Sequence, residues 1–401
     1  MNTDTDTVTG DLTFADAPDH WAAKSDKTFS SLHQLSPYIG KLKPNIAREL
    51  IATYTLPGQL VVDPFCGSGT VPLEAFLAGR AVVASDSNPY AIVLTKAKLS
   101  PPASLADALS QLEKVYTKST KRSDENFSSA PDWVRSFFHP DSFSELIRFA
   151  DECLASRNWF LLTCLLGILH HQRPGFLSYP SSHLVPYLRD KKYPRTDFPE
   201  MYEYRALLPR MRAKLTRAFK NSVEAPTFSS VVKKSSIEGL VLPSTVDAII
   251  TSPPYMNALD YRRDNRLRLW ILDRSTQNYS TEPTDKAKGL EAMVSSLVRH
   301  ALNSLKPGGI VILVVGETVI RKRTKTHPSR SYIDALLSTG MFKLISAIRD
   351  NIPDIRRSRK SGAATKAEHI LVFRKVDGER SSLSQGFQAG AKLMHSDLLV
   401  R

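Results

Sequence analysis

Residues 60–98, LVVDPFCGSGTVPLEAFLAGRAVVASDSNPYAIVLTKAK, constrain the fold more than any other part of the chain. An apolar run at 60–62 is followed by a turn rich in Gly and Ser, and a helical pattern starts at Val71. A second apolar run at 81–84 leads to a second helical pattern after Pro89. Because strands that alternate with helices form parallel sheets, we predict an α/β protein with an open parallel sheet.

Further apolar runs extend this sheet. They predict strands near Val231 and over 246–250, 310–315, 342–348 and 369–373, with a Lys-Pro-Gly-Gly turn directly before the strand at 310–315. From about residue 101 to 225 the pattern is instead helical and broken by prolines. The simplest architecture is one α/β domain interrupted by a helical insertion.

The predicted domain boundaries follow from these changes of pattern. The α/β domain occupies 21–99 and 228–376, and the helical insertion occupies 100–227. Residues 1–20 are predicted to be an acidic flexible tail, and 377–401 a C-terminal extension.

Charge and cysteine content restrict the partners and the compartment. The chain has 54 Lys and Arg against 40 Asp and Glu, a net charge of +14, which favours a polyanionic partner such as nucleic acid over a neutral one. Solvated lysines alone would give the same composition. The three cysteines lack CxxC spacing, which indicates a reducing cytoplasm and no structural metal. No apolar run approaches the roughly 18 residues of a membrane span, and the first residues do not resemble a signal peptide.

The turn DPFCGSGT, residues 63–70, has the features of a ligand-binding loop. Gly67 and Gly69 permit a ligand to approach the backbone closely. Neither GxGxxG nor GK[ST] is present, so dinucleotide and P-loop fingerprints are absent. Asp86 ends the next strand, where a carboxylate can accept both hydroxyls of a ribose. A plain strand–turn–helix with a capping aspartate remains the alternative for this loop taken alone.

A second motif, TSPPY at 251–255, ends the predicted strand at 246–250. In an open α/β sheet ligands bind at the carboxyl ends of strands, where both motifs lie. The Ser252 hydroxyl and the Pro253 carbonyl can accept the two hydrogens of an exocyclic amine on a nucleobase, and the prolines fix that carbonyl's direction. Tyr255 offers a flat face on which an extruded base can stack. As a bare string, SPPY also occurs in ordinary turns.

Together the two motifs resemble those of the amino-methylating class of AdoMet-dependent DNA methyltransferases. DPFCGSGT resembles the FxGxG element that binds S-adenosyl-L-methionine (AdoMet), and TSPPY resembles the catalytic (Asp/Asn/Ser)-Pro-Pro-(Tyr/Phe) element. SPYIGKLKPNIARELI resembles the element that contacts the methionine end of AdoMet, and LKPGGIVILVVGE resembles a later core strand. The resemblance covers about residues 29–99 and 230–375.

This resemblance implies a Rossmann-like class I AdoMet-dependent methyltransferase fold with a mostly parallel seven-stranded sheet. It implies AdoMet as the cofactor, S-adenosyl-L-homocysteine as the product, and no metal. The implied catalytic residues are Ser252, Pro253, Pro254 and Tyr255. The implied cofactor-binding residues are Lys41, Lys43, Pro44, Asp63, Pro64, Phe65, Gly67, Gly69, Thr70, Asp86, Ser87 and Asn88.

Serine in the first position of the catalytic element is typical of the enzymes that methylate N4 of cytosine. We therefore predict a site-specific DNA methyltransferase, cytosine-N4-specific, that flips its target base out of duplex DNA. The alternatives are N6-adenine methylation, guanine-N2 methylation in RNA, and a non-catalytic nucleic-acid-binding protein. The chain departs from the family pattern where the third strand ends, because Ser235 and Ser236 occupy the place of an acidic residue near the adenine of AdoMet.

Contacts with double-stranded DNA are predicted from basic side chains near the active edge and in the insertion, the leading candidate for target recognition. The residues assigned are Arg173, Arg262, Arg263, Arg266, Lys322, Arg323, Arg356 and Arg357. The arginines after the catalytic motif, which include Arg268, can equally be the solvated side of a helix whose Leu267, Trp270 and Ile271 face a core. The resemblance also implies a bacterial, cytoplasmic and nucleoid-associated protein of the restriction-modification type. The sequence leaves open whether a cognate restriction endonuclease, acting separately, accompanies it.

Overall fold

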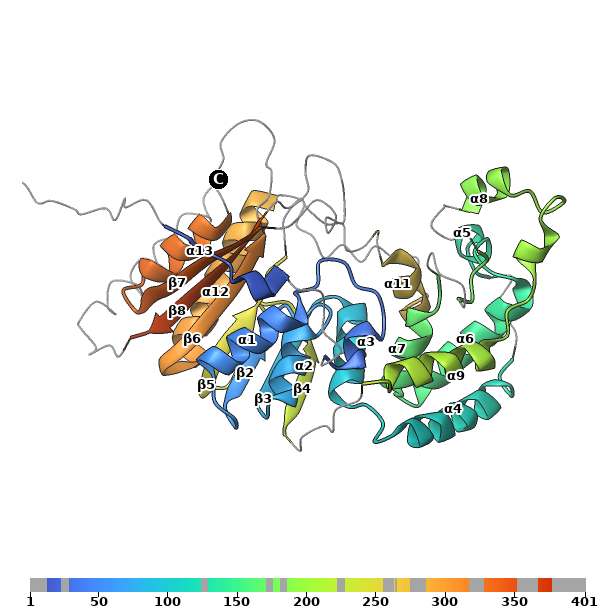
Figure 1. The fold of residues 1–401 in the computed structure, drawn as a ribbon, viewed down its shortest axis with the longest axis horizontal. Helices are drawn as coiled ribbons and strands as arrows, with labels where there is room; N and C mark the ends of the chain where they lie inside the picture. Colours follow the sequence, from blue (N-terminus) through green and yellow to red (C-terminus); the bar gives the residue numbers. More distant parts are fainter. Residues whose placement is uncertain are drawn as a thin grey trace, which may run out of the picture.

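The computed structural model describes residues 13–22, 29–123, 129–170, 176–180, 186–221, 228–254, 263, 265–274, 286–316, 328–351 and 367–376. An eight-stranded sheet forms the centre of the larger lobe (Figure 1). Its strands are β1 (Ala15–Asp16), β2 (Leu60–Asp63), β3 (Ala81–Asp86), β4 (Ser230–Lys234), β5 (Val246–Thr251), β6 (Leu305–Gly316), β7 (Phe342–Asn351) and β8 (Ala367–Lys375).

The strand order is β1-β7-β8-β6-β5-β2-β3-β4. Strand β8 runs antiparallel to both of its neighbours, and all other pairs are parallel. Counted from β2, the parallel part has the order 3-2-1-4-5 of a doubly wound sheet. The predicted fold class, a Rossmann-like class I methyltransferase fold, is therefore confirmed.

Helices cover both faces of the sheet, so the central strands are continuous apolar runs rather than alternating ones. On one face lie α1 (Pro44–Tyr54), α2 (Thr70–Leu77) and α3 (Pro89–Leu99), and on the other α12 (Lys286–Ser304) and α13 (Pro328–Leu337). Within β2, for example, Val61 packs on the first face and Val62 on the second. Two proline-started helices have clear boundaries: Pro44 opens α1, and the Asn88 side chain caps α3 by accepting from the Tyr90 amide.

The insertion is helical, as predicted. It contains α4 (Leu105–Ser119), α5 (Asp132–Arg135), α6 (Pro140–Ala155), α7 (Trp159–Gly167), α8 (Pro186–Lys192) and α9 (Leu207–Ala218). Its core is continuous with the larger lobe, because Tyr90, Val93 and Leu94 of α3 belong to the same hydrophobic cluster. Helix α11 (Arg266–Leu272), which follows the TSPPY motif, packs into this cluster and lies between the two lobes (Figure 1). Through this shared core the insertion is built onto α3.

Two predictions about chain segments need correction. The tail predicted at 1–20 is wrong in its second half: β1 pairs with β7, and Trp21 is buried with its Nε1 donating to Glu49. With β1 the sheet has eight strands instead of the predicted seven. The sequence did not predict β1, because a strand of two residues is too short to show a periodic pattern. The Lys-Pro-Gly-Gly segment, predicted as a turn, bulges from the start of β6, since Leu305 pairs with Val246 and Ile310 with Ala248. None of the described helices combines the length and the apolar character needed to cross a membrane.

Candidate active site

A pocket opens at the carboxyl ends of β2, β3 and β5, where the strand order reverses between β2 and β5. Such a switch point is where doubly wound sheets bind ligands. The pocket is lined by Tyr38, Gly40, Lys41, Leu42, Asp63, Pro64, Phe65, Cys66, Gly67, Ser68, Thr70, Val71, Asp86, Ser87, Asn88, Ser235, Ser236, Ile237, Glu238, Ser252, Pro254, Gly289 and Met293. The two motifs, far apart in the sequence, thus share one pocket.

The loop between β2 and α2 requires glycine at two positions. Gly67 and Gly69 have φ of +45° and +71°, which L side chains rarely adopt. A Cβ on Gly69 would lie 2.7 Å from Thr95 Oγ1, and one on Gly67 would lie 3.4 Å from the Tyr38 ring. The glycines therefore permit both the sharp turn and the close approach of neighbouring groups. Of the predicted set, Gly69 supports the loop without lining the pocket.

Asp86 holds this loop against the end of β3. Its Oδ2 accepts from the Gly67 amide at 2.9 Å and its Oδ1 from the Asn88 amide at 2.8 Å. Burial raises the pKa of Asp86 to about 6. Each carboxylate oxygen retains a further lone pair, so the group can also accept hydroxyls from a ligand in the pocket.

Asp63 joins the two motifs directly. Thr251 donates its hydroxyl to Asp63 Oδ1 at 2.6 Å, and the Phe65 amide donates to the same oxygen at 3.2 Å. Burial raises the pKa of Asp63 to about 7. Sequence reasoning missed Thr251 as a functional residue; the signal was a hydroxyl side chain at the end of an apolar strand, directly before Ser252.

The TSPPY motif is described up to its second proline. Ser252 and Pro254 line the pocket, and Pro253 is buried beside them. Tyr255 lies outside the described residues. Ser252 follows β5 directly, which places its side chain at the rim that faces the glycine loop.

The segment before α1 forms another wall of the pocket. Lys41 lines it, and burial lowers the pKa of its amine. Lys43 and Pro44, also predicted to contact the cofactor, do not line it. The Lys43 amine instead donates to Asp350 Oδ2 at 2.8 Å, and Pro44 is the first residue of α1. In this segment the residues that line the pocket are therefore Tyr38, Gly40, Lys41 and Leu42.

The end of the third strand is partly as predicted. Ser235 and Ser236 follow β4 and line the pocket, and so does Glu238, which sequence reasoning missed. The signal available was weak: Glu238 is the first acidic residue after this strand, but a loop conformation was needed to bring it to the pocket.

The arginines that follow the TSPPY motif divide into different roles. Arg263 and Arg266 are both exposed, and the guanidinium of Arg266 also stacks on the Trp133 ring at 3.9 Å. Arg268 is buried, and its Nε donates to the Leu166 carbonyl, so it belongs to the core and not to a phosphate-binding surface. Leu267, Trp270 and Ile271 are buried, as the spacing predicted.

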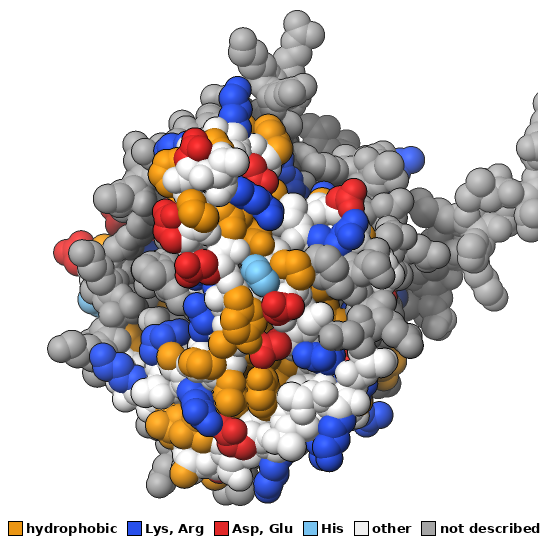
Figure 2. Space-filling model, turned by 90° about the vertical axis from the view of Figure 1, so that its right-hand side faces the viewer, with side chains coloured by type: hydrophobic (Ala, Val, Ile, Leu, Met, Phe, Trp, Pro, Cys, Tyr) orange, Lys and Arg blue, Asp and Glu red, His pale blue; other side chains and the backbone are white. Residues whose placement is uncertain are grey.

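The other predicted DNA contacts, Arg173, Arg262, Lys322, Arg323, Arg356 and Arg357, lie outside the described residues. The outer end of the insertion carries basic, acidic and hydrophobic side chains side by side (Figure 2). Among the residues that the structure describes, this face therefore carries both signs of charge.

The strand order and the position of this pocket are those of a class I AdoMet-dependent methyltransferase fold, in which S-adenosyl-L-methionine would occupy the pocket. The residues fit the cofactor, since a loop with glycine at 67 and 69 and the carboxylate of Asp86 lie at one switch point. Burial raises the pKa of Cys66 well above its usual value, which leaves this thiol protonated. Among the side chains described, no group of three or more His, Cys, Asp or Glu could hold a metal ion.

Comparisons with known proteins agree with this class. Residues 38–179 match the family described as D12 class N6 adenine-specific DNA methyltransferase. A 111-residue segment is 32% identical to the Type II methyltransferase M.MvaI of Kocuria varians, and covers 26% of this chain and 24% of that protein. The chain thus matches about a quarter of the length of this curated relative.

Solved structures with a related fold are more distant. TrmN from Thermus thermophilus has 15% identity and a TM-score of 0.35 over 86% of this chain and 52% of that chain. An rRNA methylase from Streptococcus thermophilus has 10% identity and a TM-score of 0.32 over 84% of this chain and 99% of that chain.

Proposed function

We propose that this protein is a DNA methyltransferase that transfers the methyl group of AdoMet to an exocyclic amine of a base flipped out of duplex DNA. The observation that carries the proposal is that one pocket contains both the glycine loop and the Ser252–Pro254 segment. The match of residues 38–179 to a DNA methyltransferase family supports DNA as the substrate.

Each wall of the pocket has a distinct task in this proposal. Gly67 and Gly69 leave room for the cofactor, and Asp86 accepts the ribose hydroxyls. Lys41 pairs with the carboxylate of the methionine end. Glu238 accepts from the adenine amino group in place of an acid at the end of the third strand.

The acceptor amine is oriented by Ser252 and Pro253. AdoMet supplies the methyl group on an electrophilic sulfonium, so the enzyme needs only to place the amine in line. The Ser252 hydroxyl and the Pro253 carbonyl accept the amine's two hydrogens, which stabilises the positive charge that develops on nitrogen. Tyr255 stacks on the flipped base. No cysteine nucleophile takes part, in accord with the raised pKa of the Cys66 thiol.

Two target bases remain, and a different observation favours each. The matched family is the N6-adenine class, which favours adenine. The match ends at residue 179 and so does not include the TSPPY motif, whose serine favours cytosine N4. Adenine N6 is the better supported reading, and cytosine N4 is the second candidate.

Nucleoside mass spectrometry of DNA incubated with the purified protein and AdoMet tests the proposal. A 6-methyladenine peak supports the first reading and a 4-methylcytosine peak the second. A Ser252→Ala variant should lose either product while it retains AdoMet binding. If no DNA is modified and RNA gains N2-methylguanine, the substrate proposal is wrong. DNA binding without AdoMet binding would indicate a non-catalytic protein.

A further inference from the structure

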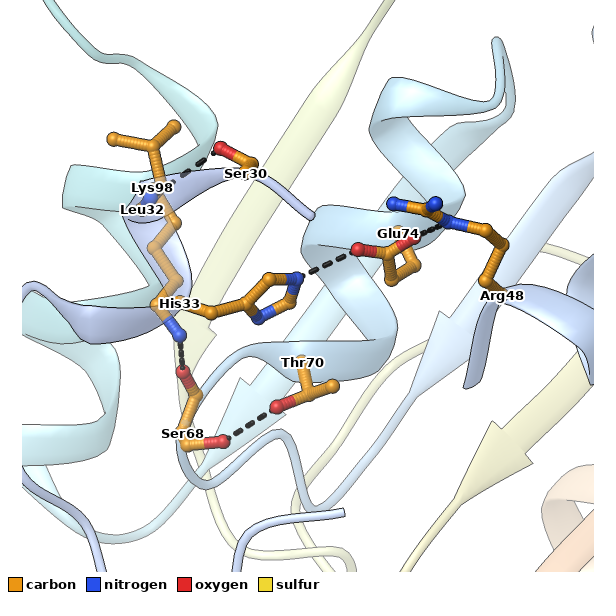
Figure 3. Close-up of polar contacts among 8 residues, drawn as sticks. All are labelled: Ser30, Leu32, His33, Arg48, Ser68, Thr70, Glu74 and Lys98. Carbon is orange, nitrogen blue, oxygen red and sulfur yellow. Dashed lines mark hydrogen bonds and ion pairs between the residues drawn. The ribbon is translucent and has the colours of Figure 1, made fainter. Parts of the chain in front are cut away.

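A cluster of buried ionisable side chains lies behind the glycine loop and has no part in the mechanism above (Figure 3). Lys98 of α3, Glu74 of α2 and His33 of the short helix η2 (Ser31–Gln34) are 1%, 2% and 6% exposed. Removal of charges from water is costly unless each gains a partner, so each of these contacts needs an explanation.

Lys98 contacts the loop itself. Its Nζ donates to the backbone carbonyl of Ser68, the residue between the two glycines. Lys98 does not line the pocket, so this bond turns the carbonyl toward α3. Because the peptide is planar, the direction of the Ser68 carbonyl also fixes that of the Gly69 N–H.

The neighbouring groups of the loop are held as well. The Gly67 amide donates to Asp86, the Gly69 amide donates to the Cys66 carbonyl at 2.6 Å, and the hydroxyls of Ser68 and Thr70 share a hydrogen bond of 2.8 Å. Lys98 therefore supplies the contact that satisfies the central carbonyl of the loop. Without it this acceptor would be buried without a partner or would turn toward the pocket.

The burial and the neighbouring charges of Lys98 change the pKa of its amine. Burial, and then the charge of Lys41, lower the pKa of Lys98 to about 7. The carboxylate of Glu74 opposes this shift. Burial raises the pKa of Glu74, but hydrogen bonds from His33 at 2.6 Å and Arg48 at 2.8 Å outweigh it, so Glu74 stays ionised.

We propose that Lys98 is a positioning residue for the cofactor: its bond to the Ser68 carbonyl holds the glycine loop in the conformation that receives AdoMet. The inference rests on the assignment of AdoMet as the cofactor. It predicts that Lys98 controls cofactor affinity without contact with the cofactor.

The test compares two buried lysines that hold backbone carbonyls. Lys375 of β8 donates to the carbonyls of Leu302 and Leu305, and burial lowers the pKa of its amine too, but unlike Ser68 neither Leu302 nor Leu305 lines the pocket. Lys98→Met and Lys375→Met should both lower Tm. By titration calorimetry only Lys98→Met should raise the Kd for AdoMet, by about tenfold or more, as expected for loss of a hydrogen bond to a charged group. In steady-state assays its KM for AdoMet should rise while kcat changes little.

Three outcomes would overturn the inference. An unchanged Kd in folded Lys98→Met shows that the loop holds its conformation without the lysine. Equal rises in Kd for both variants show a general effect of stability. Absence of AdoMet binding in the wild-type protein removes the cofactor assignment itself, which is a separate failure.

If Lys98→Met does not fold, the same comparison is made with Lys98→Arg and Lys375→Arg. The longer guanidinium keeps the donors but presses on the Ser68 peptide. We expect Lys98→Arg to raise the Kd for AdoMet by about threefold, or ~0.7 kcal/mol, and Lys375→Arg to leave it unchanged. An unchanged Kd for Lys98→Arg overturns the inference.

Discussion

The two walls of the pocket are built in different ways. The cofactor wall, residues 63–70 and 86–88, is held by backbone groups: positive-φ glycines and amides that donate to Asp86. The acceptor wall, residues 251–254, contains two prolines that supply no amide, and the hydroxyl of Thr251 links it to Asp63 of the cofactor wall. The conformation of the cofactor wall is held by its own backbone and by the carboxylate of Asp86. The second depends on the stiffness of its proline rings and on the bond from Thr251 to Asp63.

This difference determines how each wall should respond to substitution. A wall held by backbone conformation should fail when that conformation is disturbed, and cofactor binding should fail with it. A wall held by proline rings and a side-chain bond should keep the cofactor and lose its alignment. Four predictions test this contrast, with the two largest expected effects first and the smallest last.

Gly69→Ala should break the cofactor wall. The new Cβ would lie 2.7 Å from Thr95 Oγ1 and 3.2 Å from Thr95 Cα, at a φ of +71°. We expect the Kd for AdoMet to rise by about two orders of magnitude, or ~2.7 kcal/mol, in titration calorimetry. Gly58→Ala is the matched control, because Gly58 has a φ of +82° but nothing within 4 Å of a built Cβ.

The control should lose only the stability that left-handed strain costs, about 1–2 kcal/mol, and should bind AdoMet normally. Equal losses of AdoMet affinity in the two variants would show that strain at a positive φ explains the loss, and not the close contact of residue 69 with Thr95.

A second prediction concerns His33, which anchors the segment leading to Tyr38–Leu42. Burial lowers the pKa of His33 to about 4, against 6.5 in the unfolded chain. Between these values the unfolded state binds the extra proton, so the folded state loses stability as pH falls from 6.5 to 4. The full effect is about 3 kcal/mol. Glu74 and Lys98 are the charged groups that face the ring and oppose one another.

His33→Gln keeps a donor for Glu74 but does not titrate. Asp63 and Asp86 titrate in the same window with raised pKa values, so the quantity to measure is the difference between wild type and variant. In urea unfolding from pH 7 to pH 4, this difference should change by the stated amount. Parallel curves for the two proteins would show that His33 is not buried in its neutral form.

The same contrast explains what sequence could predict. The cofactor wall depends on local requirements that residues display individually: glycine where φ is positive, an apolar run before it, and an aspartate at the next strand end. Fold class, insertion and most strands followed from the same local patterns. Contacts between segments that are distant in the sequence could not be predicted from such local patterns. They include the contacts of Thr251 with Asp63 and of Lys98 with Ser68, and the position of Glu238 at the pocket.

Side chains that bind groups far away in the sequence also differ from what their local motif predicts. Lys43 resembled a cofactor contact in its motif, yet Asp350 of β7, far along the chain, binds its amine. Arg268 resembled a surface arginine, but the insertion core encloses it. A charge in a sequence does not reveal which segment will fold against it.

Thr251→Val is the third prediction and should affect the acceptor wall. It removes the donor to buried Asp63 and keeps the side-chain shape, so strand β5 should persist. We expect kcat to fall by about tenfold, or ~1.4 kcal/mol, with the Kd for AdoMet nearly unchanged. Thr251→Ser should restore most of the rate. Thr163→Val, which removes a buried hydroxyl bound to the Val93 carbonyl, is the control and should leave kcat unchanged.

A larger loss of AdoMet affinity than of kcat in Thr251→Val would place this bond with the cofactor wall. That result would contradict the division drawn above.

Glu238→Gln is the fourth prediction and carries the smallest effect, because the Glu238 side chain is exposed and water screens its contacts. The amide keeps an acceptor for the adenine amino group but loses the charge. We expect a rise of about threefold in the Kd for AdoMet, or ~0.7 kcal/mol, and a weaker dependence of that Kd on salt. Glu200→Gln, an exposed glutamate of the insertion, controls for net charge. If both variants shift the Kd equally, the charge acts at long range and Glu238 does not contact the adenine. If only Glu238→Gln shifts it, the loop after β4 supplies the acid that Ser235 and Ser236 lack.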